Sequence, residues 1–395
     1  MLRSAAIACT VVSAASALYW GSLDHGFHYD DYHSVVRNPH IRSIANVSRF
    51  FLDPSTFSEE AENAMYRPVL LTTYALNVSA TGLNARGFHL INVLLHGLNA
   101  GLVFLFLLNL VGERNMAAGG ALLFAVHPLN SEAVNYVSSR SELLMATFLL
   151  LACVLYLRFR EVGGARWYIA AFAAAALSLL TKSVGGITVF TLMSCDWLQT
   201  GWDGIRTQWR RYVAFLALPA VYLLFTRTIV GKAVLSPVRS LDVQLWTQLK
   251  ALVFYAFTTG VPVKLSVDPQ FSLSRGVDDP VVLCVWLFIV SLSIVIIRNS
   301  RLLAFTWLWA VIALLPVLVV PLIVLVNEHR MYVAGIGFCL AAMWAFTRMN
   351  ARRPKVAKVV VGLYLVILAS LTAERNKVWA DELGLWDDAA RKGPK

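Results

Sequence analysis

The chain has 395 residues, of which 58% are hydrophobic and 14% charged, and its formal net charge is +11. Its mean hydropathy of +0.64 excludes an ordinary soluble domain, because too few polar residues remain to face water. The apolar residues form runs of roughly 16 to 25, the length that crosses a bilayer as a helix. The composition therefore predicts an all-α polytopic membrane protein and explains most of the positive charge as a signal of topology.

About eleven transmembrane helices are predicted from these runs. The first, 4–23, also has features of a signal peptide, but aromatic residues and an acidic pair follow at once, which favours an uncleaved span. The predicted spans are residues 4–23, 88–111, 116–132, 142–157, 167–181, 184–199, 212–230, 280–297, 303–326, 331–347 and 357–373.

The charge distribution predicts the orientation of these spans. With the N-terminus in the cytoplasm, each short inner loop is basic, as membrane topology requires. These loops carry Arg114, Arg158, Arg160, Arg166, Arg206, Arg210, Arg211, Arg298, Arg301, Arg348, Arg352, Arg353, Lys355 and Lys358.

Residues 242–262 form a further apolar stretch that is read in one of two ways. A span at this position would move the basic turn 298–301 to the outside, so we interpret 231–279 as an outer loop with an amphipathic helix at the interface. Lys250 and Asp242 would then face water. The outer face is predicted to carry this loop, the loop 24–87 and residues 374–395, and therefore the function.

The outer loop 24–87 begins with two adjacent acids, Asp30 and Asp31, directly after the first span. Ionisable residues at the hydrocarbon boundary are candidates for function, and a carboxylate at this position is suited to act as a general base on a hydroxyl group. The alternative is that both acids simply face water at the end of the span. Further along the loop, residues 66–76, which begin with Tyr66, Arg67 and Pro68, suit a short helix on the membrane surface.

Polar residues also recur in and between the spans that follow. His89, Asn92, His96 and Asn99 repeat at a spacing of three or four, which predicts one polar stripe along the second span and a groove wall. Charged and polar side chains from separate segments then converge on the outer face. These are His127, Glu132, Arg140, Glu142, Lys182, Glu328, His329 and Arg330.

Two further observations limit the chemistry. The chain contains no P-loop, GxGxxG or HExxH motif, and its five cysteines lie in or beside apolar runs without a CxxC pair, so we infer neither disulfides nor a zinc site. Lys182, Arg275 and Arg330 are predicted to bind a phosphate at headgroup depth, because cationic side chains pair with phosphate oxygens.

The order of these segments resembles the transmembrane and tetratricopeptide-repeat O-mannosyltransferases and their bacterial relatives, which are glycosyltransferases of the GT-C class. Seven strings carry the resemblance: HYDDYHSVVRNPHI, YRPVLLTTYALN, GFHLINVLLHGLNA, LLFAVHPLNSEAVNYVSSRSELLMATF, LTKSVGGITVF, NEHRMYVAGIGFC and RNKVWADELGLWDDAARKGPK. The family usually has an acid after the lysine of LTKSVGGITVF, where this chain has Ser183, so a role for that acid cannot be carried over.

The resemblance implies a fold and a reaction. Residues 1–373 would be a catalytic GT-C-type bundle with membrane-parallel helices in its two outer loops, and 374–395 the truncated start of a periplasmic tetratricopeptide-like region. By this resemblance Asp30 would be the catalytic base, supported by Asp31. Our own hypothesis is that Lys182, Arg275 and Arg330 share the binding of the donor phosphate. The groove would be supported by Arg67, His89, Asn92, His127, Glu132, Arg140, Glu142, Glu328, His329 and Tyr332.

The implied donor is mannose on a polyprenyl phosphate, and the implied acceptor is a Ser or Thr hydroxyl of a protein at the periplasmic face of a bacterial inner membrane. Attack by a single activated hydroxyl predicts inversion at the sugar carbon. The sequence names no certain cofactor and leaves a divalent metal open; it points to lipid and protein partners and away from nucleic acid. The alternatives are a transporter or lipid flippase, which would place polar residues near the midplane, and a structural membrane scaffold.

Overall fold

The computed structural model describes residues 2–227, 238–276 and 279–393. Within these ranges the chain forms helices, turns and irregular segments without a strand, which confirms the all-α prediction. The α-helices are α1 (Leu2–Leu18), α2 (Val47–Phe50), α3 (Pro68–Thr81), α4 (Ala85–Val111), α5 (Arg114–Ala125), α6 (Ser131–Asn135), α7 (Arg140–Val162), α8 (Ala165–Thr181), α9 (Thr188–Thr207), α10 (Arg210–Phe225), α12 (Leu241–Gly260), α13 (Pro280–Asn299), α14 (Arg301–Val319), α15 (Met331–Arg352), α16 (Pro354–Val378) and α17 (Glu382–Lys392).

Short 3-10 and π-helices shape the connections between them. The 3-10 helices are η1 (Trp20–Asp24), η3 (His40–Arg42), η4 (Ile44–Asn46), η5 (Pro54–Phe57), η6 (Ala61–Asn63), η7 (Pro128–Asn130), η8 (Val137–Ser139), η9 (Ser183–Ile187) and η10 (Glu328–Arg330), and η2 (Tyr32–Val36) is a π-helix. Most lie in the first outer loop or in the turns that precede α6, α7, α9 and α15.

The helix ends follow from local side-chain chemistry. Asn84 caps α4 by accepting the N–H of Arg86 at 3.1 Å, and Asp381 caps α17 by accepting the N–H of Gly384 at 2.8 Å, as short polar residues do at helix N-termini. Gly112 ends α4 at φ +73°, a left-handed conformation that favours glycine. These caps set the positions at which the chain reverses between helices.

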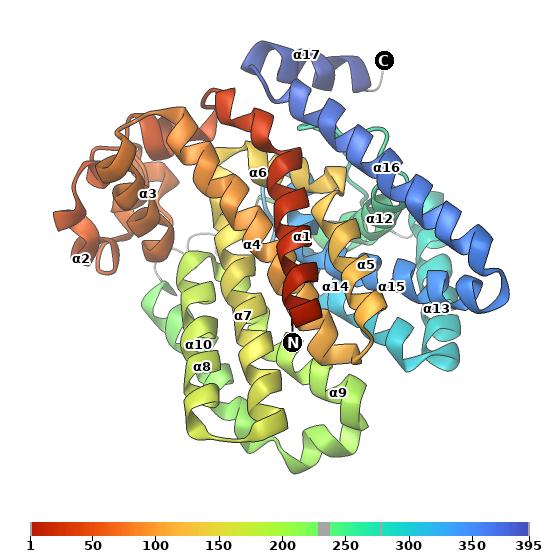
Figure 1. Ribbon diagram of the computed structural model, residues 1–395. Coiled ribbons are helices and arrows are strands. Elements are labelled where there is room, and N and C mark those ends of the chain that lie inside the picture. Colours follow the sequence, from red (N-terminus) through yellow and green to blue (C-terminus); the bar gives the residue numbers. More distant parts are fainter. Residues whose placement is uncertain (1, 228–237, 277–278, 394–395) are drawn as a thin grey trace.

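The interior of the molecule is a bundle in which α4 packs against α1, α5 and α7, and α15 packs against α5 and α14. Figure 1 shows α8, α9 and α10 on one flank of this bundle, α13 and α16 on the other, and the segment with α2 and α3 beside α4 and α7. The C-terminal helix α17 lies at the upper edge of this view. The bundle core includes Phe104, Phe106, Trp309 and Tyr332, all of which are buried.

Several described helices have the length and composition of membrane spans. Five helical segments are long and apolar enough to cross a bilayer, namely Ala85–Val111, Val137–Val162, Arg301–Val319, Glu328–Arg352 and Pro354–Val378; shorter apolar helices run over Leu2–Leu18, Ala165–Thr181 and Pro280–Ile296. The prediction of a polytopic membrane protein is therefore confirmed, while the count of about eleven spans stays a prediction. The end of the predicted span 212–230 lies outside the described residues.

Two details differ from the sequence-based expectations. The predicted span 116–132 contains the helix α5 of only 12 residues, about 18 Å long at 1.5 Å per residue and shorter than the roughly 30 Å of hydrocarbon. It ends because Pro128 opens the turn η7. In α12, Asp242 is exposed as predicted, but the Lys250 side chain is only 13% exposed and lies 3.8 Å from the Asp279 carboxylate.

Candidate functional site

Asp31 is the buried member of the acidic pair and joins two distant segments. Its Oδ2 accepts the backbone N–H of His28 at 3.0 Å. Its Oδ1 accepts the N–H of Ser138 at 2.7 Å and the Ser138 hydroxyl at 2.6 Å. Burial raises the pKa of the Asp31 carboxyl to about 7, against the lowering effect of the hydrogen bonds from Ser138 and His28. Asp31 therefore anchors the first outer loop to the turn that precedes α7.

Asp30 has the opposite environment. Its side chain is 60% exposed, and the ring of His33 lies close by, with Nε2 3.5 Å from Oδ1. The Asp30 carbonyl accepts the Ser34 hydroxyl at 2.7 Å, which fixes the main chain at the start of η2. The two acids thus have different roles: Asp31 holds the loop in place, whereas the exposed Asp30 carboxylate is accessible to a ligand.

Two cavities meet at Asp30, Tyr136 and His329. The first, which we call the cationic cavity, has a volume of about 420 Å³ and is lined by Asp30, His33, Ser34, Phe57, Glu60, Asn63, Met65, Arg67, Tyr136, Ser138, Ser139, Ser141, Lys182 and His329. The second, the aromatic cavity, has a volume of about 570 Å³ and is lined by Tyr29, Asp30, Tyr136, Val267, Asp268, Pro269, Gln270, Phe271, Ile323, Val324, Leu325, Val326, Asn327, His329 and Trp386. Asp30 is therefore placed where the contents of the two cavities would come into contact.

The cations of the first cavity come from the ends of helices. Lys182 directly follows α8 in an extended conformation and forms an ion pair with the Glu142 carboxylate. The Nε2 of His329 lies 3.8 Å from the same carboxylate. Arg67 precedes α3 and donates to the Ser141 hydroxyl at 3.4 Å. Two cations therefore flank a space that opens to Asp30, an arrangement suited to phosphate oxygens.

Glu132 orients the histidine that the two cavities share. Its carboxylate is buried, and Oε1 lies 2.6 Å from Nδ1 of His329 while Oε2 accepts the His329 backbone N–H at 3.0 Å. The imidazole is thus held between Glu132 and Glu142. The predicted convergence of Glu132, Glu142, Lys182 and His329, which are distant in sequence, is present in the structure.

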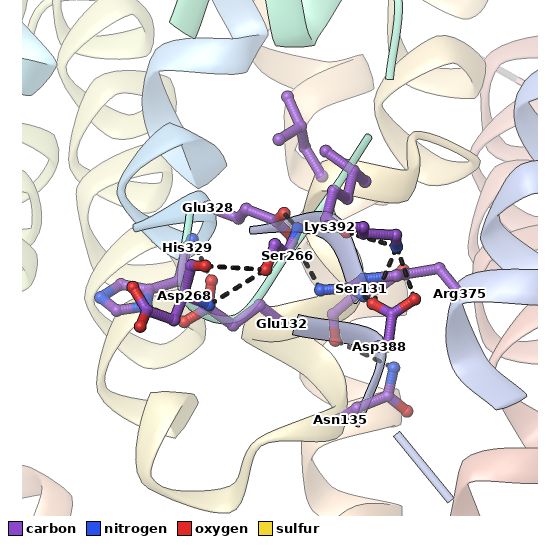
Figure 2. A network of polar contacts seen from close by, with 12 residues as sticks. Ser131, Glu132, Asn135, Ser266, Asp268, Glu328, His329, Arg375, Asp388 and Lys392 are labelled. Carbon is purple, nitrogen blue, oxygen red and sulfur yellow. Dashed lines mark hydrogen bonds and ion pairs between the residues drawn. The ribbon is translucent and has the colours of Figure 1, made fainter. Parts of the chain in front are cut away.

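Figure 2 shows how Glu328 connects this cluster to the C-terminal helix. Glu328 accepts the N–H of Ser266 at 2.6 Å and lies 3.6 Å from Nη2 of the buried Arg375. Arg375 pairs with Asp388 at 2.8 Å, and Lys392 reaches Asp388 at 2.7 Å. The contacts of α17 therefore continue into the residue next to His329.

The polar stripe of the second predicted span lies inside the bundle and lines neither cavity. Arg140 is fully buried, donates to Asn92 at 2.9 Å and to the Phe88 carbonyl at 3.0 Å, and lies over the Phe88 ring. His89 contacts the Gly26 carbonyl at 3.0 Å. His127 contacts the Thr259 carbonyl, and Tyr332 contacts His96 and Asn99. These buried side chains hold the helices together inside the bundle and do not line the cationic or the aromatic cavity.

Two predicted phosphate ligands lie elsewhere. Arg330 donates to the main-chain carbonyls of Leu325 and Val324 at 2.8 and 2.9 Å, so it holds residues that line the aromatic cavity, while its own side chain lines neither cavity. Arg275 is exposed and lines neither cavity. Arg67, expected only as groove support, instead shares the cationic cavity with Lys182.

An apolar groove of about 370 Å³ lies beside the cationic cavity. It is lined by Tyr66, Phe172, Ala176, Leu179, Leu180, Ala214, Ala217, Leu218, Val221, Tyr222 and Phe225. Most of these residues belong to α8 and α10, and the Tyr222 hydroxyl donates to the Tyr66 carbonyl at 3.2 Å. Because Tyr66 directly precedes Arg67, part of the groove lining is next to a cation in the chain.

Sequence reasoning missed several cavity residues. Tyr136 and Ser138 stand within the predicted string AVNYVSSRSE, but nothing in their spacing indicated contact with Asp30 and Asp31. Trp386 and Gln270 come from the C-terminal segment and from the loop 261–279, and only the tertiary fold brings them together. Among the described residues, no group of three or more His, Cys, Asp or Glu side chains is arranged to hold a metal ion.

Comparison with known proteins supplies an independent observation. The chain is 26% identical to a protein O-mannosyl-transferase of Caenorhabditis elegans over 95% of its own length and 56% of that relative. It is 34% identical to protein O-mannosyl-transferase TMTC3 of Mus musculus over 37% of the chain and 16% of the relative. It is also 34% identical to protein O-mannosyl-transferase TMTC1 of Homo sapiens over 40% of the chain and 18% of the relative.

The chain thus spans about half or less of the length of these curated relatives. No family model matches the chain. The names of the relatives nevertheless confirm the resemblance that the seven sequence strings predicted.

Proposed function

We propose that this TMTC-like chain is an inverting glycosyltransferase that moves mannose from a polyprenyl phosphate to the hydroxyl of a protein Ser or Thr. The observation that carries the proposal is the position of Asp30, an exposed carboxylate at the junction of two cavities, one of which contains cations. The names of the relatives, which are protein O-mannosyl-transferases, support the transfer of mannose to protein.

The donor fits the cationic cavity and the apolar groove together. A polyprenyl chain stays in an apolar environment because exposing each methylene to water costs about 0.8 kcal/mol. The groove on α8 and α10 offers such an environment, and its lining includes Tyr66, next to Arg67. The phosphate would then lie between Arg67 and Lys182, with the sugar carbon directed towards Asp30.

The reaction is a single displacement in which Asp30 acts as the base. The acceptor hydroxyl oxygen bonds to the anomeric carbon from the side opposite the phosphate, and Asp30 takes up the hydroxyl proton. The bond between the anomeric carbon and the phosphate oxygen breaks, and the polyprenyl phosphate leaves with the electron pair. Arg67 and Lys182 stabilise the charge that develops on the leaving oxygen, and the sugar carbon is inverted.

The neighbouring residues position these groups. Asp31 holds the backbone that carries Asp30, because its carboxylate is bound to Ser138 and His28. Glu142 binds Lys182 and so keeps the ammonium group at the cavity wall. Glu132 fixes the His329 ring between the two cavities.

We further propose that the site lies at the periplasmic face of a bacterial inner membrane. Arg158, Arg160 and Arg166 flank the α7–α8 turn, which Figure 1 shows at the lower edge of the molecule, whereas α17 lies at the upper edge. Basic turns mark the cytoplasmic side, and α17 packs on the residues around the cavities. The site would therefore face away from the cytoplasm.

The experiment uses the purified chain in lipid nanodiscs with polyprenyl-phosphate mannose and Ser/Thr peptides. We expect transfer by the native chain, with no detectable transfer by Asp30→Asn, since a general base contributes about 10²- to 10⁴-fold. Binding of the donor to Asp30→Asn should be unchanged. Asp24→Asn, which alters an exposed acid paired with Arg86, is the matched control and should retain activity. Normal transfer by Asp30→Asn would refute the assignment, and preference for polyprenyl-phosphate glucose would refute mannose.

A further inference from the structure

The aromatic cavity raises the question of what occupies the space on the other side of Asp30. Unlike the cationic cavity, it is lined by no Lys or Arg among the described residues. Its ionisable side chains are Asp30, Asp268 and His329, and the rest of its wall is aromatic, aliphatic or amide in character. The aromatic cavity is therefore unsuited to a phosphorylated ligand, and it suits an uncharged or cationic chain.

The irregular residues 323–327 line part of the aromatic cavity, and three of them have main-chain donors without an internal partner. Within the described part of the chain, the backbone N–H groups of Ile323, Val324 and Leu325 donate no hydrogen bond, while Arg330 binds the carbonyls of Val324 and Leu325. Ile323 is 81% exposed and Val324 47%. Main-chain N–H groups without an internal partner can bind the carbonyls of an extended peptide, as those of a sheet edge do.

Another part of the lining, which we call the aromatic wall, includes Tyr29, Tyr136 and the α17 residue Trp386. The ring of Trp386 lies 5.7 Å from that of Tyr29, which stacks on Tyr136 at 4.5 Å. Gln270, in the same wall, has a φ of +49°, and a non-glycine residue held in this left-handed region is a feature of functional loops. An apolar side chain of a peptide would fit against Trp386 and Tyr29.

The position of Trp386 is fixed by polar contacts and by apolar packing. Leu385 and Ala389 of α17 pack with Tyr136, Val267 and Trp379. The network in Figure 2 adds Arg375 to Asp388 and Lys392 to the Leu265 carbonyl, both within 2.8 Å. The helix is thus joined to the loop that supplies Asp268 and Gln270, so the aromatic wall forms one unit.

We propose that the aromatic cavity binds the acceptor as an extended peptide and that Trp386 sets the affinity for it. This inference rests on the proposed function, because it assigns the acceptor to one side of Asp30 and the donor to the other. The main chain of the peptide pairs with the N–H groups of residues 323–325, and an apolar side chain contacts Trp386 and Tyr29. The Ser or Thr hydroxyl then points to Asp30.

The test measures binding of a fluorescent Ser/Thr peptide to the full chain in nanodiscs, and separately the KM values for peptide and donor. Trp386→Ala should weaken peptide binding and raise the peptide KM by about tenfold or more, as removal of a buried aromatic contact does. The donor KM and kcat should change less than twofold. Trp386→Phe should restore most of the affinity. Leu383→Ala, on the same helix at an 82% exposed position, is the matched control.

The outcomes separate this inference from the proposed function. Unchanged peptide affinity in Trp386→Ala overturns the inference, and so does a raised donor KM with an unchanged peptide KM, which would place the donor or another lipid in this cavity. Asp30→Asn should still bind the peptide. If the native chain binds peptide through Trp386 but transfers no sugar, the binding site stands and the proposed reaction fails.

Discussion

Replacing Asp31 by alanine tests whether this buried carboxylate holds the reactive loop. The change removes the acceptor of three hydrogen bonds, from the His28 N–H, the Ser138 N–H and the Ser138 hydroxyl. The hydroxyl has an alternative partner, because the Ser34 hydroxyl lies 3.0 Å away. The lasting loss is therefore two buried backbone donors, each of which costs about 1–3 kcal/mol when left without an acceptor. We expect Asp31→Ala to lower the free energy of unfolding by about 2–6 kcal/mol.

The assay is the unfolding midpoint of purified native and variant chains in the same detergent, together with transfer activity. Ser138→Ala is the matched control, since it removes the hydroxyl bond but keeps both backbone donors and their acceptor, and should cost about 1 kcal/mol. Activity should fall in Asp31→Ala because Asp30 loses its fixed backbone. An unfolding midpoint equal to that of the native chain, or an equally large loss in Ser138→Ala, would refute the reasoning.

The same carboxyl predicts a pH dependence whose sign follows from its pKa. That pKa is raised from 3.8 to about 7 by burial, so the folded state takes up a proton between these values. Below about pH 4 the carboxyl is protonated in both states, and above about pH 7 it is ionised in both. The stability of the native chain should therefore fall as the pH rises from 4 to 7 and then level off. The difference in stability between the native chain and Asp31→Asn should show this slope, and a flat difference would contradict it.

Two further predictions concern the walls of the proposed donor site. Gly185→Ala, in the turn after Lys182, should lower stability by about 3 kcal/mol and weaken donor binding, because its Cβ atom would lie 2.4 Å from the Ser178 carbonyl carbon. Gly186→Ala should be tolerated, because the nearest neighbour of its Cβ atom would be 3.5 Å away. Thermal unfolding distinguishes the two variants. Ala176→Trp should fill the apolar groove and raise the KM about tenfold for a long-chain donor but not for a short-chain donor. Ala173→Trp, exposed on the same helix, should change the KM of neither donor. Equal effects of Ala176→Trp on both donors would contradict a prenyl chain in the groove.

Most of the fold could be predicted from the apolar runs of the sequence. The ranges 142–157, 167–181 and 331–347 lie within α7, α8 and α15, because a run of this length has few alternatives to a helix in lipid. The run 116–132 was misread as one helix since its hydropathy does not reveal that Pro128 begins a new turn. The environment of Lys250 was also missed, because its partner Asp279 is distant in sequence and becomes close only through packing.

The site was predictable in its acids and less so in its cations. Adjacent carboxylates at a membrane boundary stand out in a sequence because ionisable groups there are costly. Which of the two is buried depends on Ser138, a contact between residues 107 positions apart. Arg330 was a reasonable choice of phosphate ligand by position, yet its guanidinium binds carbonyls of the preceding segment. Arg67 takes the place beside Lys182 through the fold of the first loop.

The segment between α6 and α7 explains why the donor, the acceptor and the base would meet with the required accuracy. Tyr136 lies in the wall of both cavities, Ser138 binds the carboxylate that anchors Asp30, and Ser141 contacts Arg67. Glycosyl transfer needs the attacking oxygen about 3 Å from the sugar carbon and in line with the leaving group. These three contacts come from the six consecutive residues 136–141. A shift of this segment would therefore displace the base and both cavity walls together. Arg140, buried at the start of α7 and bonded to Asn92 and Asn77 of neighbouring helices, prevents that shift. In the proposed reaction, Asn92 of the buried polar stripe would thus help to hold the turn that carries Tyr136 and Ser138.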